Sequence, residues 1–499
     1  MNPKTVRPVT PCRHRAVSRH VAGALLLAVL ACAGAAPVAA GEADAPGELR
    51  VDFSKVSGEI RPLHGGNCGP LQYGEITDLT AYHRELGIPF TRLHDCHWPN
   101  PDVVDIHAVF PDPAADPARP ESYDFRRTDD YIQAVVNAGS RIVYRLGESI
   151  EHSRRKYHVH PPKDAEKWAA VCQGIIRHYN EGWAGGFRLG IPYWEIWNEP
   201  ENRPAMWTGN DEDYFRLYEV TAKAIKSRWP DLKVGGPSVG HTGRVKDGRL
   251  EPGEFLLRFL ERCRERALPL DFLSWHLYTD DPSECRVRAR GIRDLLDRAG
   301  FTRAESHFNE WNYLPGNDWA PMTAGGRPEA RERFYDQIGG APGAAFAACV
   351  LLNLQDAPVD VANYYMFDNH GFGLFTFHGV PRKSFHAMKA FRRLLDTPLR
   401  AEAAGALPDR LAVGAGLHRE KTSAGILVGN LRFEGRPLRV RVTGLPWGGA
   451  TAFDLSVVDA ARSLEVVRSG ALPAGGLDLS AELKAPAVGL LRLRPEAGR

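Results

Sequence analysis

Two short segments of this 499-residue chain each place a glutamate directly after a strand-like hydrophobic run. The first reads YWEIWNEP over residues 193–200 and contains Glu199, and the second reads HFNEWN over residues 307–312 and contains Glu310. Paired carboxyl groups that face one cleft are the minimal equipment for glycoside hydrolysis: one protonates the leaving oxygen, and the other attacks the sugar or activates water. Glu199 and Glu310 are therefore the candidate catalytic pair.

The neighbours of Glu199 suggest how it would act. Trp194 and Trp197 flank it in sequence, and a partly apolar setting is expected to raise the pKa of Glu199, as a general acid near neutral pH requires. Glu195 lies four residues earlier and is expected to face a buried layer of the strand. Glu201 lies beyond the proline and is expected to belong to the following loop.

The elements that must position these residues follow the rhythm of parallel βα units, in which short apolar runs alternate with helical patterns. Eight strands are predicted, the number of a (β/α)8 TIM barrel, whose active site lies at the carboxyl ends of its strands. The two glutamates would end the fourth and seventh strands and lie across the mouth from each other. The strands are expected near residues 60–67, 90–94, 141–146, 193–198, 233–235, 272–276, 306–309 and 361–367.

Polar and aromatic residues near the other strand ends are candidate substrate contacts. Arg92 is expected to hold the nucleophile ionised by its positive charge, and His276 and Tyr278 are expected to orient Glu310 by hydrogen bonds. Isolated polar residues at such positions are also common as internally bonded structure. The substrate-binding candidates are Asn198, His64, Asn67, Arg92, His94, Asp95, Glu148, His276, Tyr278, Trp311 and Tyr365.

The pattern changes after about residue 398. Short, turn-bounded apolar runs predict an antiparallel β-sandwich over residues 398–499, appended to a barrel over 50–397. Residues 49–56 are a candidate further strand of the sandwich. No catalytic constellation is evident in this region, so a structural role is expected.

The first forty residues predict a signal peptide: five basic residues, no acidic residue, an apolar run and small residues before position 41. A retained membrane anchor and a lipoprotein attached at Cys32 are the alternatives; otherwise no stable membrane span is expected. Export to the periplasm or medium would also make disulfides possible for the six cysteines that remain, although their spacing shows no framework. Without this segment the formal charge changes from +2 to −3, and no basic patch predicts nucleic-acid binding.

The WNEP run at 197–200 and the NEW run at 309–311 resemble retaining glycoside hydrolases of clan A, most closely family 39, the β-xylosidase and α-L-iduronidase family. The resemblance implies that Glu199 is the acid/base, that Glu310 is the nucleophile and that Asn198 binds the sugar 2-hydroxyl. It implies carboxyl groups roughly 5–5.5 Å apart and net retention of configuration. Where many clan A barrels place a tryptophan at the end of strand eight, this chain has YYMFD over 364–368, so Tyr365 or Phe367 would take that place.

Two other functions remain open. His94, Asp95 and His97, with Asp102, Asp105 and His107, are metal-ligand types and would suit a metal-dependent barrel hydrolase, but no HExxH pattern accompanies them. A catalytically inactive carbohydrate-binding barrel is the other alternative. No cofactor is expected, and the partner is a carbohydrate.

The sugar and the mode of attack are open at this point. β-Xylosides, uronic-acid-containing glycans, galactosides and arabinosides all suit the two motifs. Exo or endo action depends on whether the long loops 96–123 and 314–333 close the cleft, and the oligomeric state is open too.

Overall fold

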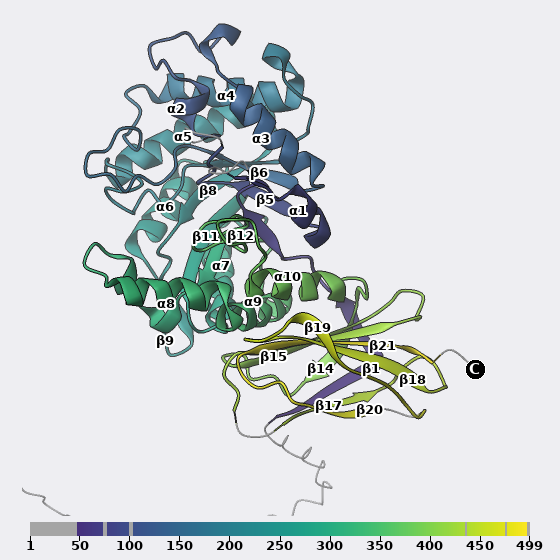
Figure 1. Ribbon diagram of the computed structural model, residues 1–499. Coiled ribbons are helices and arrows are strands. Elements are labelled where there is room, and N and C mark those ends of the chain that lie inside the picture. Colours follow the sequence, from purple (N-terminus) through teal and green to yellow (C-terminus); the bar gives the residue numbers. More distant parts are fainter. Residues whose placement is uncertain (1–46, 73–76, 99–102, 435–436, 475–476, 497–499) are drawn as a thin grey trace, which may run out of the picture. The chain divides into compact units, whose positions relative to one another are not determined.

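The computed structural model describes residues 47–72, 77–98, 103–434, 437–474 and 477–496, which belong to one compact unit (Figure 1). The expected signal peptide over residues 1–40 and its Cys32 lie outside the described residues. Within the described part of the chain, no single helix is long and apolar enough to cross a bilayer. One bent helix pair, Pro328–Gly339 with Ala341–Asp356, reaches that length and hydropathy together.

Eight parallel strands close into a barrel, so the predicted fold class is confirmed. Each predicted strand overlaps one barrel strand, but the first begins five residues later than expected, and three extend further toward their carboxyl ends. The barrel strands are β2 (Gly65–Asn67), β5 (Phe90–Leu93), β6 (Arg141–Leu146), β7 (Tyr193–Ile196), β8 (Lys233–Val239), β11 (Phe272–Thr279), β12 (Glu305–Tyr313) and β13 (Val361–Tyr364).

Helices follow the barrel strands and cover the outside of the barrel (Figure 1). The helices are α1 (Thr80–Leu86), α2 (Ile106–Val109), α3 (Arg126–Asn137), α4 (Ala165–Glu181), α5 (Asp211–Arg228), α6 (Glu254–Glu265), α7 (Glu284–Arg298), α8 (Pro328–Gly339), α9 (Ala341–Asn353) and α10 (Lys383–Leu394). Short 3₁₀ turns are η1 (Pro120–Ser122), η2 (Trp183–Gly185), η3 (Pro315–Asn317), η4 (Ala320–Met322) and η5 (Leu354–Asp356). Two small antiparallel pairs complete this part: β3 (Leu71–Gln72) with β4 (Thr77–Asp78), and β9 (Gly243–Lys246) with β10 (Arg249–Pro252).

Helix α5 shows how local sequence starts these elements. The Asn210 side chain accepts from the backbone N–H of Asp213, and the Asp213 carboxylate accepts from the backbone N–H of Asn210, which forms a capping box. Acidic residues in the first turn suit the positive end of the helix dipole. Phe215 and Tyr218 are buried on the inner face, as their spacing predicts.

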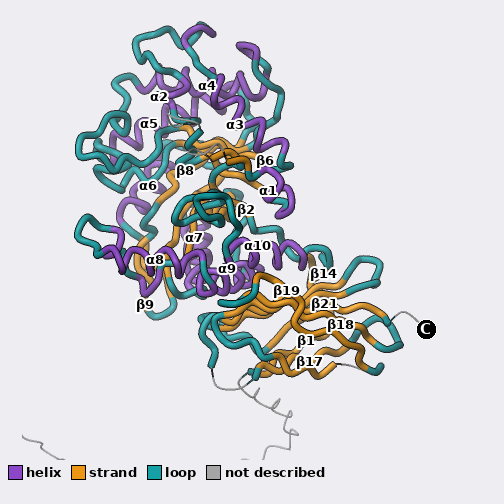
Figure 2. Tube along the Cα trace, viewed as in Figure 1, coloured by secondary structure: helices purple, strands orange, loops and turns teal. Residues whose placement is uncertain are grey.

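The C-terminal part is one continuous nine-stranded sheet with the order β19-β18-β21-β16-β15-β14-β1-β17-β20. It is antiparallel except that β1 runs parallel to β17. Inner side chains from both halves of this order, such as Val440 and Phe453, share one apolar cluster, so the sheet curls around its own core (Figure 2). The strands are β1 (Glu48–Glu59), β14 (Leu399–Ala404), β15 (Leu411–Leu417), β16 (Ala424–Asn430), β17 (Leu438–Thr443), β18 (Thr451–Val458), β19 (Ser463–Leu472), β20 (Leu477–Ala481) and β21 (Ala487–Pro495).

The outer face of this sheet is also covered, because α9 and α10 pack against its central strands. In β21, Leu491 belongs to the core of the sheet, whereas Leu490 belongs to the large cluster that includes the barrel and its helices. Side chains alternate between the two faces of a strand. The central strands are therefore apolar on both faces.

Candidate active site

Two irregularities in strand pairing shape the mouth of the barrel. Between β8 and β11 the pairing passes over Ser238, and between β11 and β12 it passes over Asn309. Such bulges insert an extra residue and re-aim the side chains beside it. Both polar side chains are buried and join one hydrogen-bond network with the candidate catalytic groups.

Several residues at the strand ends adopt a left-handed backbone that side chains other than glycine rarely accept. They include Asp95 (φ 51°), Trp197 (φ 71°), Glu199 (φ 44°) and Ser238 (φ 56°). Such conformations persist only where the surroundings enforce them, and they gather at functional sites. This strain lies at the carboxyl ends of β5, β7 and β8.

The two candidate glutamates face one cavity of about 1000 Å³. One carboxylate oxygen of Glu199, one of Glu310 and a ring nitrogen of His276 all lie within 4.8 Å of one another. The sequence alone placed the glutamates at one mouth; the tertiary structure brings their oxygens to either side of a single imidazole.

Glu199 is held by the strand and loop next to it. Its Oε1 lies 2.7 Å from His276 Nδ1, and its Oε2 accepts from Asn202 Nδ2 at 2.9 Å. Its backbone N–H donates to the Ser238 carbonyl at 3.0 Å. A Cβ at Gly240 would lie 2.3 Å from Glu199 Oε1, so a side chain there would displace the Glu199 carboxylate from its present place.

Glu310 is held by three side chains from two other strands. The Tyr278 hydroxyl donates to Oε1 at 2.7 Å, and Arg92 Nη1 donates to Oε2 at 3.1 Å. His276 Nε2 lies 3.6 Å from the same oxygen. Tyr278 and Arg92 contact Glu310 as expected, whereas the hydrogen bonds of His276 go to Glu199 and Ser238 and not to Glu310.

Arg92 is fully buried and lies at the centre of the network. Its Nε donates to Glu195 at 2.7 Å, and Nη2 donates to the Asn198 side-chain oxygen at 2.6 Å and to Ser238 Oγ at 2.7 Å. Nη1 also donates to Asn67 at 3.0 Å. One guanidinium thereby pairs with two carboxylates and fixes two amide side chains, which supplies the partners that a buried charge needs.

The pKa of Glu199 shifts in the direction opposite to the one expected from the sequence. Burial acts to raise the pKa of Glu199, but the hydrogen bonds from His276 and Asn202 outweigh it, so this pKa is lowered. Trp194 and Trp197 are absent from the described lining of the cavity that Glu199 faces; Trp194 stacks on Tyr144, and Trp197 packs edge-on against Trp207.

The pKa values of Glu310 and His276 are both raised. Burial and the charge of Glu199 raise the pKa of Glu310. For His276, burial acts to lower the pKa, but the charges of Glu310 and Glu199 outweigh it and raise this pKa. The imidazole is therefore the group between the carboxylates that holds a proton most readily.

Several other predicted substrate contacts do line the cavity. Asp95 accepts from the Ile150 backbone N–H at 3.0 Å and from the Tyr365 hydroxyl at 2.9 Å, and its other neighbour is His94 Nε2 at 3.3 Å. Asn198 also lines the cavity, and its oxygen already accepts from two donors, so its amide N–H₂ is left for a ligand. Of the two aromatic candidates after strand eight, Tyr365 lines the cavity, whereas Phe367 is buried.

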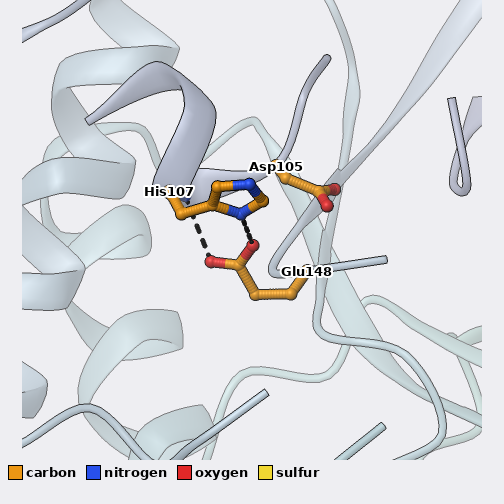
Figure 3. Close-up of side chains that lie close together, drawn as sticks. All are labelled: Asp105, His107 and Glu148. Atoms are coloured by element: carbon orange, nitrogen blue, oxygen red, sulfur yellow. Dashed lines mark hydrogen bonds and ion pairs between the residues drawn. The ribbon is translucent and has the colours of Figure 1, made fainter. Parts of the chain in front are cut away.

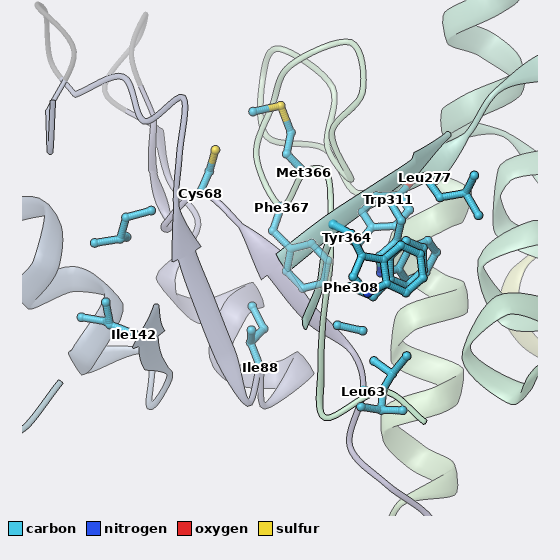
Figure 4. Packing of buried hydrophobic residues seen from close by; sticks show 14 of the residues in the cluster. Leu63, Cys68, Ile88, Ile142, Leu277, Phe308, Trp311, Tyr364, Met366 and Phe367 are labelled. Atoms are coloured by element: carbon cyan, nitrogen blue, oxygen red, sulfur yellow. The ribbon is translucent and has the colours of Figure 1, made fainter. Parts of the chain in front are cut away.

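Three candidates lie elsewhere. His64 precedes the start of β2 and contacts the Leu86 carbonyl at 3.0 Å, on the amino-terminal side of the barrel. Trp311 follows Glu310 and points outward, where it packs against Phe308 and Tyr364 (Figure 4). Glu148 is absent from the described cavity lining, and its carboxylate pairs with the His107 ring.

Asn67 and Arg92 are also absent from the described cavity lining, because they lie buried below the carboxylates. They support the site and do not face the space a substrate would occupy.

Sequence reasoning gave Glu201 no role at the site, yet the structure brings it to the cavity together with Trp319. Glu201 lines it, and its Oε1 accepts from the backbone N–H groups of Gly240 and His241 at 2.6 and 3.0 Å. Burial and the charge of Glu199 raise the pKa of Glu201 to about 7. Trp319, on the loop after β12, is 43% exposed and packs edge-on against Tyr278. The only local signal for Glu201 was its place two residues after Glu199.

Two groups of three side chains have metal-ligand chemistry within the described residues. In one, His107 Nδ1 lies 2.5 Å from Glu148 Oε2, with Asp105 close by (Figure 3). Asp105, however, is bound to the buried Arg145 guanidinium. A cation this close would repel a metal ion.

The second group is Glu199, His276 and Glu310. The Arg92 guanidinium forms an ion pair with Glu310, as that of Arg145 does with Asp105. Neither residue set therefore suits a metal ion, and Asp102 of the metal hypothesis lies outside the described residues.

The family model of glycosyl hydrolases family 39 matches residues 75–288. A β-xylosidase of Geobacillus stearothermophilus is 30% identical over 278 residues, which cover 48% of this chain and 49% of that protein. A β-xylosidase of Caldicellulosiruptor saccharolyticus is 26% identical over 308 residues, which cover 55% of this chain and 57% of that protein. The matched part of this chain thus spans about half the length of these relatives.

Solved structures extend the likeness of the fold to nearly the whole chain. A glucosidase from Croceicoccus marinus superposes with a TM-score of 0.74 at 24% identity, covering 91% of this chain and 99% of that one. A monomeric β-xylosidase from Caulobacter crescentus gives 0.66 at 18% identity, covering 90% and 100%. These two show the shared barrel and sheet fold. The match over residues 75–288 includes the motif around Glu199 and shows that this part of the chain is similar to glycosyl hydrolases family 39.

Proposed function

We propose that this chain is an O-glycosyl hydrolase that cleaves a carbohydrate with retention of configuration. The observation that carries the proposal is the approach of a Glu199 oxygen to a Glu310 oxygen within 4.8 Å in one cavity. Retaining enzymes hold their carboxyl groups about 5–5.5 Å apart, whereas inverting enzymes need about 6.5–9.5 Å to admit water. The separation favours double displacement.

In this proposal Glu310 is the nucleophile and Glu199 the acid/base. Arg92 and Tyr278 bind Glu310 in its ionised form and leave it available for attack. Without a substrate, Glu199 is less well suited to act as the general acid, since its lowered pKa favours the ionised form, which has no proton to donate. His276 resolves this, because its Nδ1 lies 2.7 Å from Glu199 Oε1 and can pass the proton that Glu199 then gives to the leaving oxygen.

The charge of the cavity favours a neutral sugar. Its described lining contains the carboxyl groups of Asp95, Glu199, Glu201, Glu284 and Glu310. The guanidinium in that lining, Arg288, donates to Glu284 at 2.6 and 2.9 Å. A uronate would meet repulsion without a matching cation. We therefore propose neutral glycosides such as β-xylosides and not uronic-acid glycans, and the names of the related β-xylosidases support this choice.

The loop after β12 is the proposed aglycone contact. It brings Asn317, Trp319 and Met322 to the cavity, and an exposed indole next to polar groups is suited to stack on a sugar ring. The other long loop, over residues 96–123, contributes no lining residue among those described. The loop after β12 thus walls the cavity on one side, and such a cavity suits the end of a glycan chain or a short oligosaccharide.

The test is stereochemical. Wild-type enzyme with an aryl β-xyloside should release β-xylose first, as followed by NMR of the anomeric proton. Glu310→Ala should lose about four orders of magnitude in kcat/KM, and external azide should restore turnover and yield the α-glycosyl azide. Release of α-xylose by the wild type would refute retention, and near-normal turnover by the variant would refute the nucleophile.

A panel of substrates separates the remaining functions. We expect aryl β-xyloside to exceed aryl β-glucoside and α-L-arabinofuranoside, and aryl uronides to be inert. An inactive carbohydrate-binding barrel would bind xylo-oligosaccharides in calorimetry but hydrolyse none of the panel. Treatment with a chelator should leave hydrolysis unchanged; a loss restored by one divalent metal would support the metal-dependent alternative.

We also propose that the protein is exported and that cleavage follows Ala40. The basic start and apolar run of residues 1–40 support this. N-terminal sequencing of protein recovered outside the cytoplasm tests it: a mature chain that begins at Gly41 is expected. A mature chain that begins at a lipid-modified Cys32 would support the lipoprotein alternative.

A further inference from the structure

The cysteines of the barrel fall into two kinds. All six that follow residue 40 are buried and present as thiols. Four of them, Cys172, Cys263, Cys285 and Cys349, have no other cysteine among the groups that shift their pKa. The fifth and sixth, Cys68 and Cys96, differ.

Cys68 and Cys96 meet at one carbonyl. Cys68 Sγ donates to the His94 carbonyl at 3.2 Å, and Cys96 Sγ lies 3.6 Å from the same oxygen. Burial raises the pKa of the Cys68 thiol, and so does a hydrogen bond with the Cys96 thiol. Both sulfur atoms thus lie against the His94 carbonyl oxygen, and both residues are 1% exposed.

The two cysteines follow the carboxyl ends of neighbouring barrel strands. Cys68 follows the last residue of β2, and Cys96 lies three residues beyond the end of β5, the strand that pairs with it at Asn67 and Arg92. The left-handed Asp95 (φ 51°) turns the chain just before Cys96. The Cys68 backbone N–H also donates to the Arg92 carbonyl at 3.0 Å, which fixes the first cysteine against the second strand.

We propose that Cys68 and Cys96 form a disulfide bond when the chain folds in an oxidising compartment. The Sγ–Sγ bond forms as the two thiols lose two protons and two electrons. A small-molecule disulfide accepts both, its own S–S bond breaks, and it leaves as two thiols. The proposal is independent of the catalytic assignment.

The burial of both cysteines sets when this happens. Thiol–disulfide exchange needs a thiolate that the oxidant can reach. In the folded barrel both sulfurs are covered, and the raised pKa of Cys68 disfavours its thiolate. The bond therefore forms before the barrel closes, and reductants reach it slowly afterwards.

The crosslink would lie beside the proposed active site, at the carboxyl ends of β2 and β5. Asn67, next to Cys68, accepts from Arg92, and Asp95, next to Cys96, accepts from Tyr365. Joining their neighbours ties together two strand ends that hold the guanidinium under Glu310 and one wall of the cavity. A covalent tie here stabilises the folded barrel by restricting the unfolded chain.

Peptide mapping tests the bond itself. Full-length protein is refolded in a buffer of oxidised and reduced glutathione, denatured, alkylated without reductant and digested. We expect one linked peptide pair that joins Cys68 to Cys96, while Cys172, Cys263, Cys285 and Cys349 are alkylated. Recovery of Cys68 and Cys96 as alkylated thiols from correctly folded protein would overturn the proposal.

A stability series tests its effect and does not require that every variant fold well. Reductant present during refolding should lower the Tm of the wild type by about 3 °C. Cys285→Ser, which removes another buried thiol, should keep this sensitivity to reductant. The double variant Cys68→Ser/Cys96→Ser should lose it. Equal sensitivity in the double variant, or none in the wild type, would contradict the bond.

Discussion

Strand β17 of the C-terminal sheet alternates strictly between buried and exposed residues, and its buried side chains, such as Val440 and Val442, are apolar. Strand β11 of the barrel is buried along nearly its whole length, yet it carries Ser274 and His276 inside. The first strand follows the two-residue period of a half-buried sheet. The second keeps polar side chains in a dry interior, where each must find a partner.

The difference shows where in this molecule unfavourable backbone conformations and buried charges are found. In the sheet, the alternation of the strands places apolar side chains together in one core cluster. At the barrel mouth, bulges, left-handed residues and a buried guanidinium hold two carboxylates close together. Proteins tolerate such conflicts mainly at functional sites. Changes at the mouth should therefore alter activity, and changes in the sheet should alter stability.

The largest effect on activity in this series is expected for Glu199→Gln at the barrel mouth. The variant cannot donate the proton, so kcat/KM should fall about 100- to 10,000-fold for substrates with poor leaving groups. Aryl glycosides with activated leaving groups, measured by release of the phenol, should be affected much less. Glu201→Gln is the matched control from the same loop and should lose less than 10-fold; an equal loss would undo the assignment of Glu199.

A smaller effect is expected for His276→Gln. Activity requires a proton on the His276–Glu199 unit, so it is lost as pH rises through the raised pKa of His276. Without the imidazole a carboxyl must hold that proton, and the alkaline limb of kcat/KM should move to lower pH, with a loss of about 10-fold at the optimum. An alkaline limb at the wild-type position would show that His276 passes no proton.

Tyr278→Phe should change the opposite limb and little else. The hydroxyl lowers the pKa of Glu310, which burial raises, so its removal raises this pKa further. Glu310 must be ionised to attack, and activity is lost as pH falls through its pKa. The acidic limb should therefore move to higher pH. Tyr365→Phe, whose hydroxyl binds Asp95 instead, should leave that limb in place.

The smallest effect on activity is expected from Leu491→Ala in β21. Its side chain is buried in the core of the sheet, and its loss should cost about 3 kcal/mol of the free energy of unfolding, as measured by denaturant titration. kcat should stay within twofold of the wild type at temperatures where the variant is folded. The exposed neighbour change Arg492→Ala should cost less than about 0.5 kcal/mol. A large loss of kcat in Leu491→Ala would mean that the sheet supports the site.

Local sequence patterns were sufficient for much of this architecture. The eight strands, the capped helix after Asn210 and the two glutamates at strand ends are visible because period, caps and turn residues act over a few neighbours. The burial of Glu195 also follows from its position within a strand. These features depend on contacts that the chain makes with itself nearby.

Other features were decided only when the barrel closed. The outward direction of Trp311 and the place of His64 depend on where each strand begins and on the register between strands. The bulges at Ser238 and Asn309 arise from pairing between separate segments, and so does the imidazole between the carboxylates that reverses the expected pKa shift of Glu199.

The cysteines give the same lesson. Cys263 and Cys285 are the nearest pair in sequence, yet Cys68 and Cys96 are the pair whose sulfur atoms lie against one carbonyl oxygen, that of His94. The sequence by itself determined the strand count, the helix starts and the two acidic motifs, because these rest on neighbours along the chain. Only the tertiary structure decided which side chains meet, because distances between separate strands are set by the register and closure of the whole ring.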